Sequence, residues 1–257
     1  MPKKNANSTE PFFRETASSL AMPDIFGNIM KDALAGEDAK YSIERDDGNV
    51  RDDLGRSYLD PFPEWPEGER QAIAHAKGSV LDIGCGAGRV MLYLREQGYA
   101  TVGIDLSPGA IGICRSQGLV GTHVMSAENM KFKPNTFDTV LLFGNNFGIL
   151  GEEPRIIKML KDLHRITTPD AIILASSRDP ENTDDPAHLK YHEWNRERQR
   201  PVGLVRIRLK YKDEIEDWWE LLLASPEDMN RLAQQAGWTL DRTFGSRNLY
   251  VGLLRKE

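Results

Sequence analysis

The stretch VLDIGCGAGR, from Val80 to Arg89, constrains the fold of this chain more than any other part of the sequence. It reads as a buried strand, a turn with three glycines spaced two apart, and the start of a helix. In an open α/β sheet, such a turn lies at the carboxyl end of a strand, where glycines let a ligand approach the backbone closely. The sequence therefore predicts a parallel sheet with a ligand site at Gly84, Gly86 and Gly88.

Helices and strands alternate around this turn. Strands are expected at residues 79–83, 100–104, 122–125, 139–143 and 171–176, and helices at 67–77, 89–97, 108–117 and 152–167. The strands are apolar runs, as in parallel sheets that are covered on both faces. A helix after Ser225 and strands at 238–244 and 249–254 complete the chain. We predict an α/β fold with a doubly wound, mainly parallel seven-stranded sheet and an antiparallel C-terminal edge pair.

Two segments do not follow this alternation. Residues 1–66 contain a short helical pattern, a hairpin turn at Asp47-Gly48 and a proline-rich stretch, so we treat them as an N-terminal segment. The main domain is expected at 67–257, interrupted by an insertion at 178–222 that holds two strand-like runs, at 204–211 and 215–222. We expect both segments to form lid elements over the ligand site.

Composition narrows the possible partners and location. The formal charge of −6 and pI of about 5.5 disfavour a protein that grips nucleic acid by electrostatics. No apolar run approaches the roughly 20 residues of a membrane span, and the first residues lack the apolar core of a signal peptide. The two cysteines, Cys85 and Cys114, lie in a predicted turn and a predicted helix, which favours reduced thiols. We expect a cytoplasmic protein with no membrane partner and no metal site.

The residues around the glycine turn indicate the ligand. A dinucleotide fingerprint needs a third glycine where this chain has Arg89, which disfavours a nicotinamide oxidoreductase, and no lysine follows to make a triphosphate loop. Asp105 ends the next strand, where a carboxylate accepts hydrogen bonds from both hydroxyls of a ribose. The glycine turn and Asp105 together favour a nucleoside ligand. The alternative is that the glycines only form a tight strand–helix turn and that Asp105 only caps the next helix.

Two segments, VLDIGCGAGR and VGIDLSPGAI, resemble motifs I and II of the class I S-adenosylmethionine-dependent methyltransferases. The resemblance implies that S-adenosylmethionine is the cofactor. It implies that the glycine turn passes under the methionine part and that Asp105 holds the ribose. Asp82 would orient the turn or the cofactor's amino group. Beside the glycines and these acids, Cys85 and Leu106 complete this part of the expected cofactor site.

Two later segments extend the resemblance. MSAENMKF is similar to the third motif, in which an acid and the next backbone amide bind the adenine; Ser126 stands in the place of that acid. Ala127 still offers its amide, and Ser126 or Glu128 is expected to reach the exocyclic amine. FDTVLLFGNNFGIL resembles the fourth motif, whose loop borders the transferred methyl group. That loop is Gly144-Asn145-Asn146, with Asn146 on the catalytic side.

Candidate bases lie in the insertion. His188 and His192 are four residues apart and share one face if the segment is helical. If the acceptor is a hydroxyl or an ammonium, a base there would remove its proton; the alternative, which we favour for each histidine, is a surface position on a lid. Tyr58 precedes the main domain, and we expect it either to stack on the sulfonium or to anchor the segment to the sheet.

Basic residues of the insertion allow two interpretations. Arg206, Arg208 and Lys210 alternate with apolar residues, while acids including Glu214 and Glu216 follow on the next strand. We expect cross-strand ion pairs within a hairpin. The alternative is a basic surface that attracts an anionic acceptor or RNA.

The sequence predicts a methyltransferase that acts on a small molecule by in-line displacement, mainly through proximity and orientation. One alternative is an RNA or protein methyltransferase, although FGNN stands where enzymes that methylate planar base nitrogens carry an NPPY-like tetrapeptide. Another is a regulatory protein that binds S-adenosylmethionine without turnover. The acceptor and the oligomeric state stay open.

Overall fold

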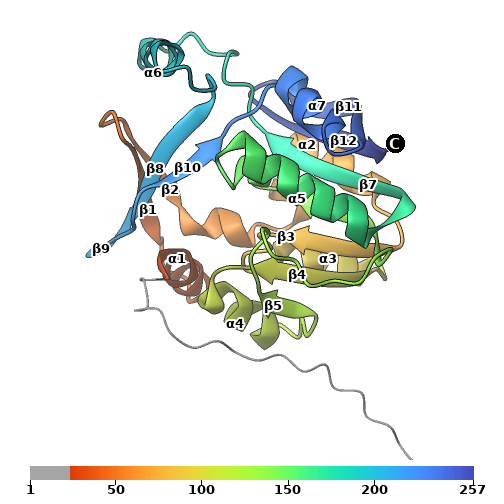
Figure 1. The fold of residues 1–257 in the computed structure, drawn as a ribbon. Coiled ribbons are helices and arrows are strands. Elements are labelled where there is room, and N and C mark those ends of the chain that lie inside the picture. Colours follow the sequence, from red (N-terminus) through yellow and green to blue (C-terminus); the bar gives the residue numbers. More distant parts are fainter. Residues whose placement is uncertain (1–23) are drawn as a thin grey trace, which may run out of the picture.

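A seven-stranded sheet forms the centre of the molecule in the computed structural model, which describes residues 24–257 (Figure 1). Its strand order is β11-β12-β7-β6-β3-β4-β5. The strands are β3 (Ser79–Ile83), β4 (Ala100–Asp105), β5 (Thr122–Val124), β6 (Phe137–Leu142), β7 (Thr167–Ser177), β11 (Trp238–Ser246) and β12 (Leu249–Lys256). The five neighbouring strands β7, β6, β3, β4 and β5 pair in parallel, whereas β12 is antiparallel to both β7 and β11. The predicted fold class is confirmed.

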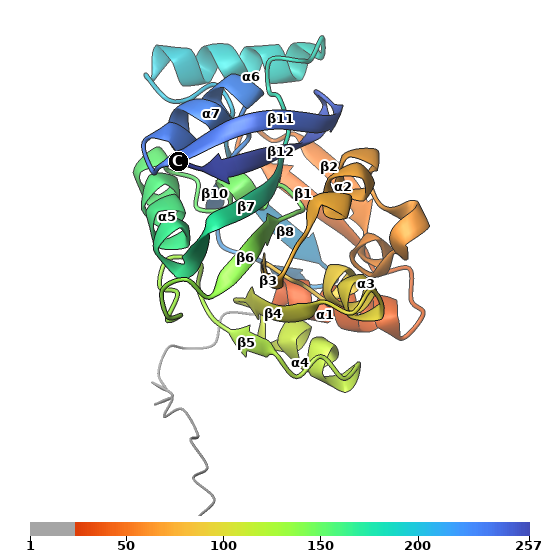
Figure 2. The same cartoon turned by 90° about the vertical axis from the view of Figure 1, so that its right-hand side faces the viewer.

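Helices cover both faces of this sheet (Figure 2). They are α2 (Glu67–Ala72), α3 (Arg89–Glu96), α4 (Pro108–Ser116), α5 (Glu153–Ile166) and α7 (Pro226–Gln234). Leu81 and Val140 pack with α5 and α7 on one face, while Val80 and Leu141 pack with α2 and α3 on the other. Successive residues of a strand point to opposite faces, so strands covered on both sides must be apolar throughout.

Two boundaries in the main domain differ from those predicted by more than two residues. The helix expected at 67–77 ends at Ala72 and continues as a 3-10 turn, Ile73–His75. The strand expected to begin at 171 begins at Thr167, immediately after α5, because Thr167 pairs with Phe137 of β6. Its hydroxyl also donates to the Leu163 carbonyl at 2.7 Å and so caps the end of α5. Tertiary pairing therefore extends this strand beyond its apolar run.

A second sheet joins the N-terminal segment to the insertion. Its strands are β1 (Lys40–Arg45), β2 (Val50–Leu54), β8 (Leu204–Tyr211), β9 (Glu214–Ile215) and β10 (Trp219–Leu222). β1 lies between β2 and β8 and pairs antiparallel with both, and β8 pairs with β9 and β10. The strand expected at 215–222 is thus interrupted: β9 ends at Ile215, and the Trp219 indole donates to Glu216 at 2.8 Å.

Two helices lie at opposite ends of the second sheet: α1 (Ile25–Leu34) near β4 and α4, and α6 (Pro186–Glu197) at the far end (Figure 1). Tyr41, Leu209 and Tyr211 pack on Ile25 and Ile29 of α1. This face of the second sheet therefore packs on α1, which in turn contacts α4 of the main domain.

The second sheet meets the main domain at the turn that follows β6. Gly148 lies so close to β10 that a Cβ there would overlap the Leu222 carbonyl. A glycine is required because two backbones approach closely there. The contact holds the second sheet against the loop that was expected to border the methyl group.

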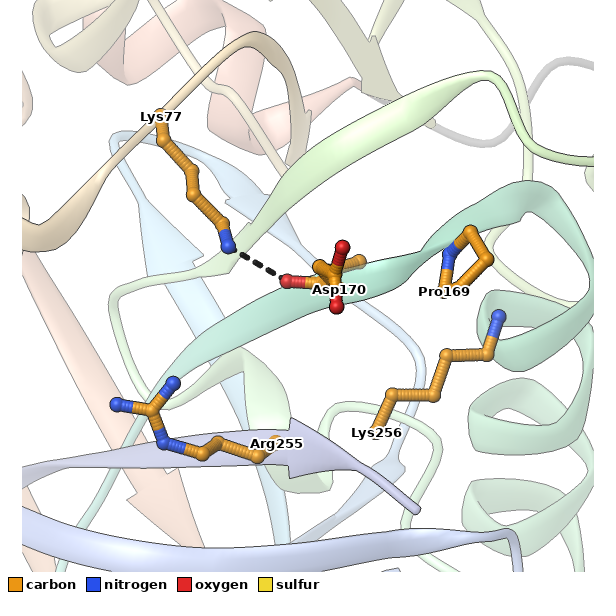
Figure 3. Close-up of a pocket in the computed structure, with 6 residues that line it drawn as sticks. Lys77, Pro169, Asp170, Arg255 and Lys256 are labelled. Carbon is orange, nitrogen blue, oxygen red and sulfur yellow. Dashed lines mark hydrogen bonds between the residues drawn. The ribbon is translucent and has the colours of Figure 1, made fainter.

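The opposite end of the main sheet carries a basic cavity of about 390 Å³ (Figure 3). Its lining residues are Lys77, Pro169, Asp170, Ala171, Arg255 and Lys256. The Lys256 ammonium donates to the carbonyls of His164 (2.6 Å) and Thr167 (2.9 Å) at the end of α5, where a cation is favourable. In the described part of the chain, no helix is long and apolar enough to cross a membrane.

Candidate active site

The glycine turn connects β3 to α3 by a left-handed backbone. Gly84 has φ +70°, and its N–H donates to the Ile104 carbonyl of β4 at 2.8 Å. A Cβ at Gly84 would overlap the Asn146 side chain, so the turn needs glycine for both conformation and space. The predicted turn therefore lies at the carboxyl ends of β3 and β4.

Asp105 is tied to this turn at the end of β4. Its Oδ2 accepts a 2.9 Å hydrogen bond from the Gly86 N–H, and its Oδ1 accepts one of 2.9 Å from the Ser107 N–H. Burial raises the pKa of Asp105, and these two hydrogen bonds oppose the shift. The next residue, Leu106, is 70% exposed, which leaves an apolar side chain open beside the carboxylate.

Asp82 is a buried carboxylate one residue before the end of β3. Its Oδ2 has no hydrogen-bond partner among the described residues. Burial raises its pKa to about 7; Arg89 lowers it, whereas Asp105 and Glu69 raise it further. A buried oxygen without a partner is costly, so this position is a candidate for contact with a ligand.

Glu69 and Arg89 form a buried ion pair beside the turn, with 2.5 Å between Oε2 and Nη2. Glu69 is 2% exposed, and its Oε1 accepts from the Gly144 N–H at 3.2 Å. The Arg89 guanidinium also lies over the Trp65 ring at 4.8 Å, and its Nη1 has no partner among the described residues. The pair links α2, α3 and the turn after β6. The sequence analysis missed Glu69, because nothing distinguishes it from the neighbouring exposed Glu67.

Asn145 and Asn146 shape the turn after β6. Asn145 has φ +66°, its N–H donates to the Ser176 hydroxyl at 2.8 Å, and its buried Oδ1 lacks a partner in the described chain. Asn146, expected on the catalytic side, donates from Nδ2 to the carbonyls of Ile83 (2.9 Å) and Gly84 (3.4 Å). The side chain of Asn146 thus joins the two loops that border the expected methyl position.

The segment expected to bind adenine forms a turn after β5. The Ser126 hydroxyl accepts from the Glu128 N–H at 3.1 Å. The Glu128 carboxylate makes two hydrogen bonds to Arg155 of α5, at 2.9 and 2.8 Å. Glu128 is therefore engaged with α5, while Ser126 and Ala127 remain half-buried near the end of β5.

Helix α1 covers the glycine turn. Asp24 caps this helix by accepting from the Gly27 N–H (3.0 Å), and it also accepts from the Gly109 N–H of α4 (2.7 Å). One carboxylate thus joins the first turns of two helices. The Met30 side chain lies 3.4 Å from where a Cβ on Gly86 would stand. The N-terminal segment accordingly reaches the predicted cofactor site.

Tyr58 packs next to this cover. Its hydroxyl shares a 3.1 Å hydrogen bond with the Tyr41 hydroxyl, and its ring meets the Phe26 ring edge-on at 6.0 Å. Burial raises its pKa well above the ordinary value. It also contacts the cluster that contains Met30 and Ala87. These contacts make Tyr58 an anchor of the N-terminal segment at the glycine turn.

The two cysteine side chains lie under the turn. The Cys114 thiol donates to the Gly86 carbonyl at 3.1 Å, and both cysteines pack with Met91. The neighbouring Cys114 thiol and burial raise the pKa of Cys85. The Cys85 side chain therefore belongs to the core, and only its backbone borders the predicted cofactor site.

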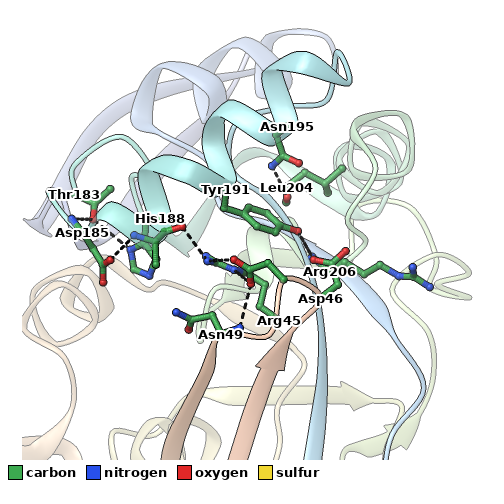
Figure 4. Close-up of polar contacts among 12 residues, drawn as sticks. Arg45, Asp46, Asn49, Thr183, Asp185, His188, Tyr191, Asn195, Leu204 and Arg206 are labelled. Carbon is green, nitrogen blue, oxygen red and sulfur yellow. Dashed lines mark hydrogen bonds and ion pairs between the residues drawn. The ribbon is translucent and has the colours of Figure 1, made fainter.

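The segment that carries His188 is indeed helical, as α6 (Figure 4). His192 lies four residues further along this helix and therefore on the same face. His188 lies 3.2 Å from the Thr183 hydroxyl, while His192 is buried, and burial, followed by Arg196, lowers its pKa. α6 is attached to the β1–β2 turn through Tyr191, which donates to Asp46 at 2.7 Å. The structure thus places both histidines at the end of the second sheet away from α1.

The ion pairs of the second sheet differ from those expected. Arg208 and Lys210 each pair with Glu44 of β1, at 2.7 Å, rather than with Glu214 or Glu216 of the following strand. Glu216 instead accepts from the Trp219 indole, as described above. The expected partners were wrong because β1, and not only β9, lies beside β8.

The fold and these groups define a Rossmann-like, nucleoside-binding α/β domain: a glycine turn and a ribose-type acid lie at the carboxyl ends of adjacent parallel strands. Comparison with known proteins is more specific. A family described as a methyltransferase domain matches residues 80–170. A methyltransferase from Bacteroides fragilis, crystallised with S-adenosylhomocysteine, superimposes with a TM-score of 0.77 over 91% of this chain and 94% of its own, at 22% identity.

Curated relatives agree with this class. An uncharacterized methyltransferase of Synechocystis is 28% identical over 67% of this chain and 70% of its own length. A bovine 18S rRNA (guanine-N(7))-methyltransferase is 38% identical over 24% of the chain and 23% of its own length. A 2-heptyl-1-hydroxyquinolin-4(1H)-one methyltransferase of Mycobacteroides abscessus is 36% identical over 26% of the chain and 36% of its own length. The last two matches span well under half of the relatives' length. Residues 80–170 thus match the methyltransferase domain family, and the chain has the fold of an S-adenosylmethionine-dependent methyltransferase.

Proposed function

We propose that this protein transfers a methyl group from S-adenosylmethionine to a small-molecule acceptor bound between the carboxyl ends of the main sheet and the second sheet. One observation carries the proposal: buried polar atoms without partners gather around the glycine turn. Of the four such atoms in the described chain, Asp82 Oδ2, Arg89 Nη1 and Asn145 Oδ1 lie on or beside the turns after β3 and β6. A ligand with both positive and negative groups would satisfy them.

The amino-acid end of S-adenosylmethionine fits this set, because its ammonium matches the two oxygens and its carboxylate matches the guanidinium. Asp105 would hold the ribose, with its orientation already set by the N–H groups of Gly86 and Ser107. The exposed Leu106 would face the adenine, and Ser126 and Ala127 would border it. When bound, the cofactor supplies a methyl group activated by a positively charged sulfur.

The chain's own part in transfer would be orientation and exclusion of water. The Glu69–Arg89 pair and the Asn146 amide fix the glycine turn relative to the turn after β6, so donor and acceptor sites keep a constant spacing. α1 and Tyr58 close one side of the site, and a dry site strengthens the electrostatic attraction at the reacting atoms. We propose that the chain divides into an N-terminal segment, 1–66, and a main domain, 67–257, that carries an insertion at 178–222. The N-terminal segment and the insertion would form the lid over the site.

A general base would be needed for a hydroxyl or ammonium acceptor. His192 is the better candidate of the two histidines, because its lowered pKa keeps the imidazole neutral near pH 7 and able to accept a proton. Its position on α6 requires an acceptor that extends along the second sheet, or closure of α6 over the site.

A small-molecule acceptor is favoured because two separate segments of the chain build a second sheet beside the main one, and such an addition would enclose the acceptor rather than leave it exposed. The similarity to the bovine rRNA methyltransferase makes rRNA the main competing acceptor. The test is calorimetric titration with S-adenosylmethionine and S-adenosylhomocysteine, with NADH as comparator, followed by transfer assays with labelled cofactor on metabolite pools, rRNA and protein. Labelled metabolites support the proposal. Labelled rRNA or protein overturns the acceptor, and cofactor binding without transfer indicates a regulatory protein.

A further inference from the structure

Arg178 lies where β7 reaches the carboxyl edge of the main sheet, the same edge that carries Gly84 and Asp105. It directly follows Ser177, the last residue of β7. The next residue, Asp179, is buried and pairs with Arg247 at 3.1 Å. Arg178 instead lies near Arg51 and Asp53 of β2, which are close enough to alter its pKa. The side chain therefore extends toward the second sheet.

The Arg178 guanidinium is partly buried without a matching anion. The side chain is half-buried, and no hydrogen bond contributes to its shifted pKa within residues 24–257. Burial lowers its pKa, Arg51 lowers it further, and Asp53 opposes the shift. A cation that has lost part of its hydration and gained no partner is unfavourable in the free protein.

The neighbouring part of the second sheet adds a second cation. Arg51 and Asp53 stand opposite Ile43 and Tyr41 in the β1–β2 register, and neighbours across a sheet share a face. This is the face that packs on α1 through Tyr41. Arg51 and Asp53 lie 3.5 Å apart, and the Asp53 carboxylate forms no ion pair with Arg178. Arg178 and Arg51 together carry two positive charges, against the single negative charge of Asp53.

Building on the proposed methyl transfer, we propose that Arg178, assisted by Arg51, binds an anionic group of the acceptor, a carboxylate or a phosphate monoester, so that the substrate is a small anionic molecule. A guanidinium matches both groups because it donates two parallel hydrogen bonds in one plane. The partial burial of Arg178 favours a small molecule over the phosphate backbone of RNA, which binds mostly at open basic surfaces.

The test compares matched probes by calorimetry, with and without saturating S-adenosylhomocysteine: benzoate against benzamide, hexanoate against hexanamide, and phenyl phosphate against phenol. We expect one of the anionic probes to bind at least about tenfold more tightly than its neutral counterpart. Arg178→Gln should abolish this preference, Arg178→Lys should retain part of it, and both should bind S-adenosylhomocysteine within about twofold of wild type. Arg242→Gln, which alters an exposed arginine of β11 paired with Asp241, is the matched control and should change nothing.

Equal binding of acids and neutral analogues by the wild type, or an undiminished preference in Arg178→Gln, overturns the proposal. Binding of single-stranded RNA that Arg178→Gln abolishes overturns the small-molecule assignment. If circular dichroism shows that Arg178→Gln fails to fold, Arg178→Lys and Arg51→Gln decide. A reduced anion preference in either variant supports the site, and an undiminished preference in both refutes it. Anion preference without binding of S-adenosylhomocysteine would refute the methyltransferase function but keep the anion site; the reverse result would refute this inference alone.

Discussion

The Asp105 carboxylate accepts a 2.9 Å hydrogen bond from the backbone N–H of Gly86. This bond joins the acid at the end of β4 to the middle glycine of the turn after β3. The two motifs that we propose contact different parts of the cofactor are therefore one connected unit, and a change at Asp105 should affect both the proposed ribose contact and the shape of the turn.

Replacing Asp105 by Ala should weaken binding of S-adenosylhomocysteine by about 1–3 kcal/mol, because it removes hydrogen bonds to a charged acceptor. Isothermal calorimetry measures the change directly. Asp241→Ala, an exposed carboxylate on β11 with no contact to the turn, serves as the control. Unchanged affinity in Asp105→Ala would refute the ribose assignment.

Asp82 should make stability depend on pH. Its folded pKa of about 7 lies above the ordinary value, so the folded state retains a proton that the unfolded state has lost. The Asp82 contribution is therefore complete below about pH 4 and is lost as the pH rises to about 7, by at most about 1.4 kcal/mol per unit. Urea unfolding between these pH values tests this. The same slope in wild type and Asp82→Asn would contradict it.

Cofactor binding should have the opposite pH dependence. An ammonium ligand needs the ionised Asp82 carboxylate, so affinity for S-adenosylhomocysteine should rise as the pH increases through about 7. Calorimetry from pH 6 to 8 measures it, and Asp82→Asn should bind weakly and flatten the profile. A flat profile in the wild type would rule out contact between Asp82 and the amino group.

Breaking the Glu69–Arg89 pair should be costly. Glu69→Gln leaves the partly buried Arg89 charge uncompensated, and we expect a loss of about 3–5 kcal/mol in the free energy of unfolding. Glu67→Gln, on the exposed side of the same helix, is the matched control. If the two variants unfold at the same urea concentration, the pair does not stabilise the turn.

His192→Ala should spare cofactor binding and lower turnover by about 10²-fold if His192 is the base. Loss of the acidic limb of the pH–rate profile would separate this role from a merely structural one, and His188→Ala provides the comparison on the same face of α6. An undiminished rate in His192→Ala would remove it as a candidate.

The local sequence determined the main domain. Apolar runs with helical or strand periodicity, and glycines spaced for a turn, depend on neighbouring residues, so β3, α3 and the positions of Asp82 and Asp105 followed from the order of residues. The identity of the cofactor class followed from the same short motifs. A helix or a turn forms largely from interactions within a few residues, which is why a single sequence is informative about it.

Only the tertiary structure decided how the site is covered and which charges meet there. β1 pairs with β8 across more than a hundred and fifty residues, and this pairing redirected Arg208 and Lys210 to Glu44. The burial of Glu69 and the unmatched charge of Arg178 likewise depend on elements distant in sequence. Non-local strand pairing and desolvation arise from the packing of whole elements, and no local pattern of residues encodes them.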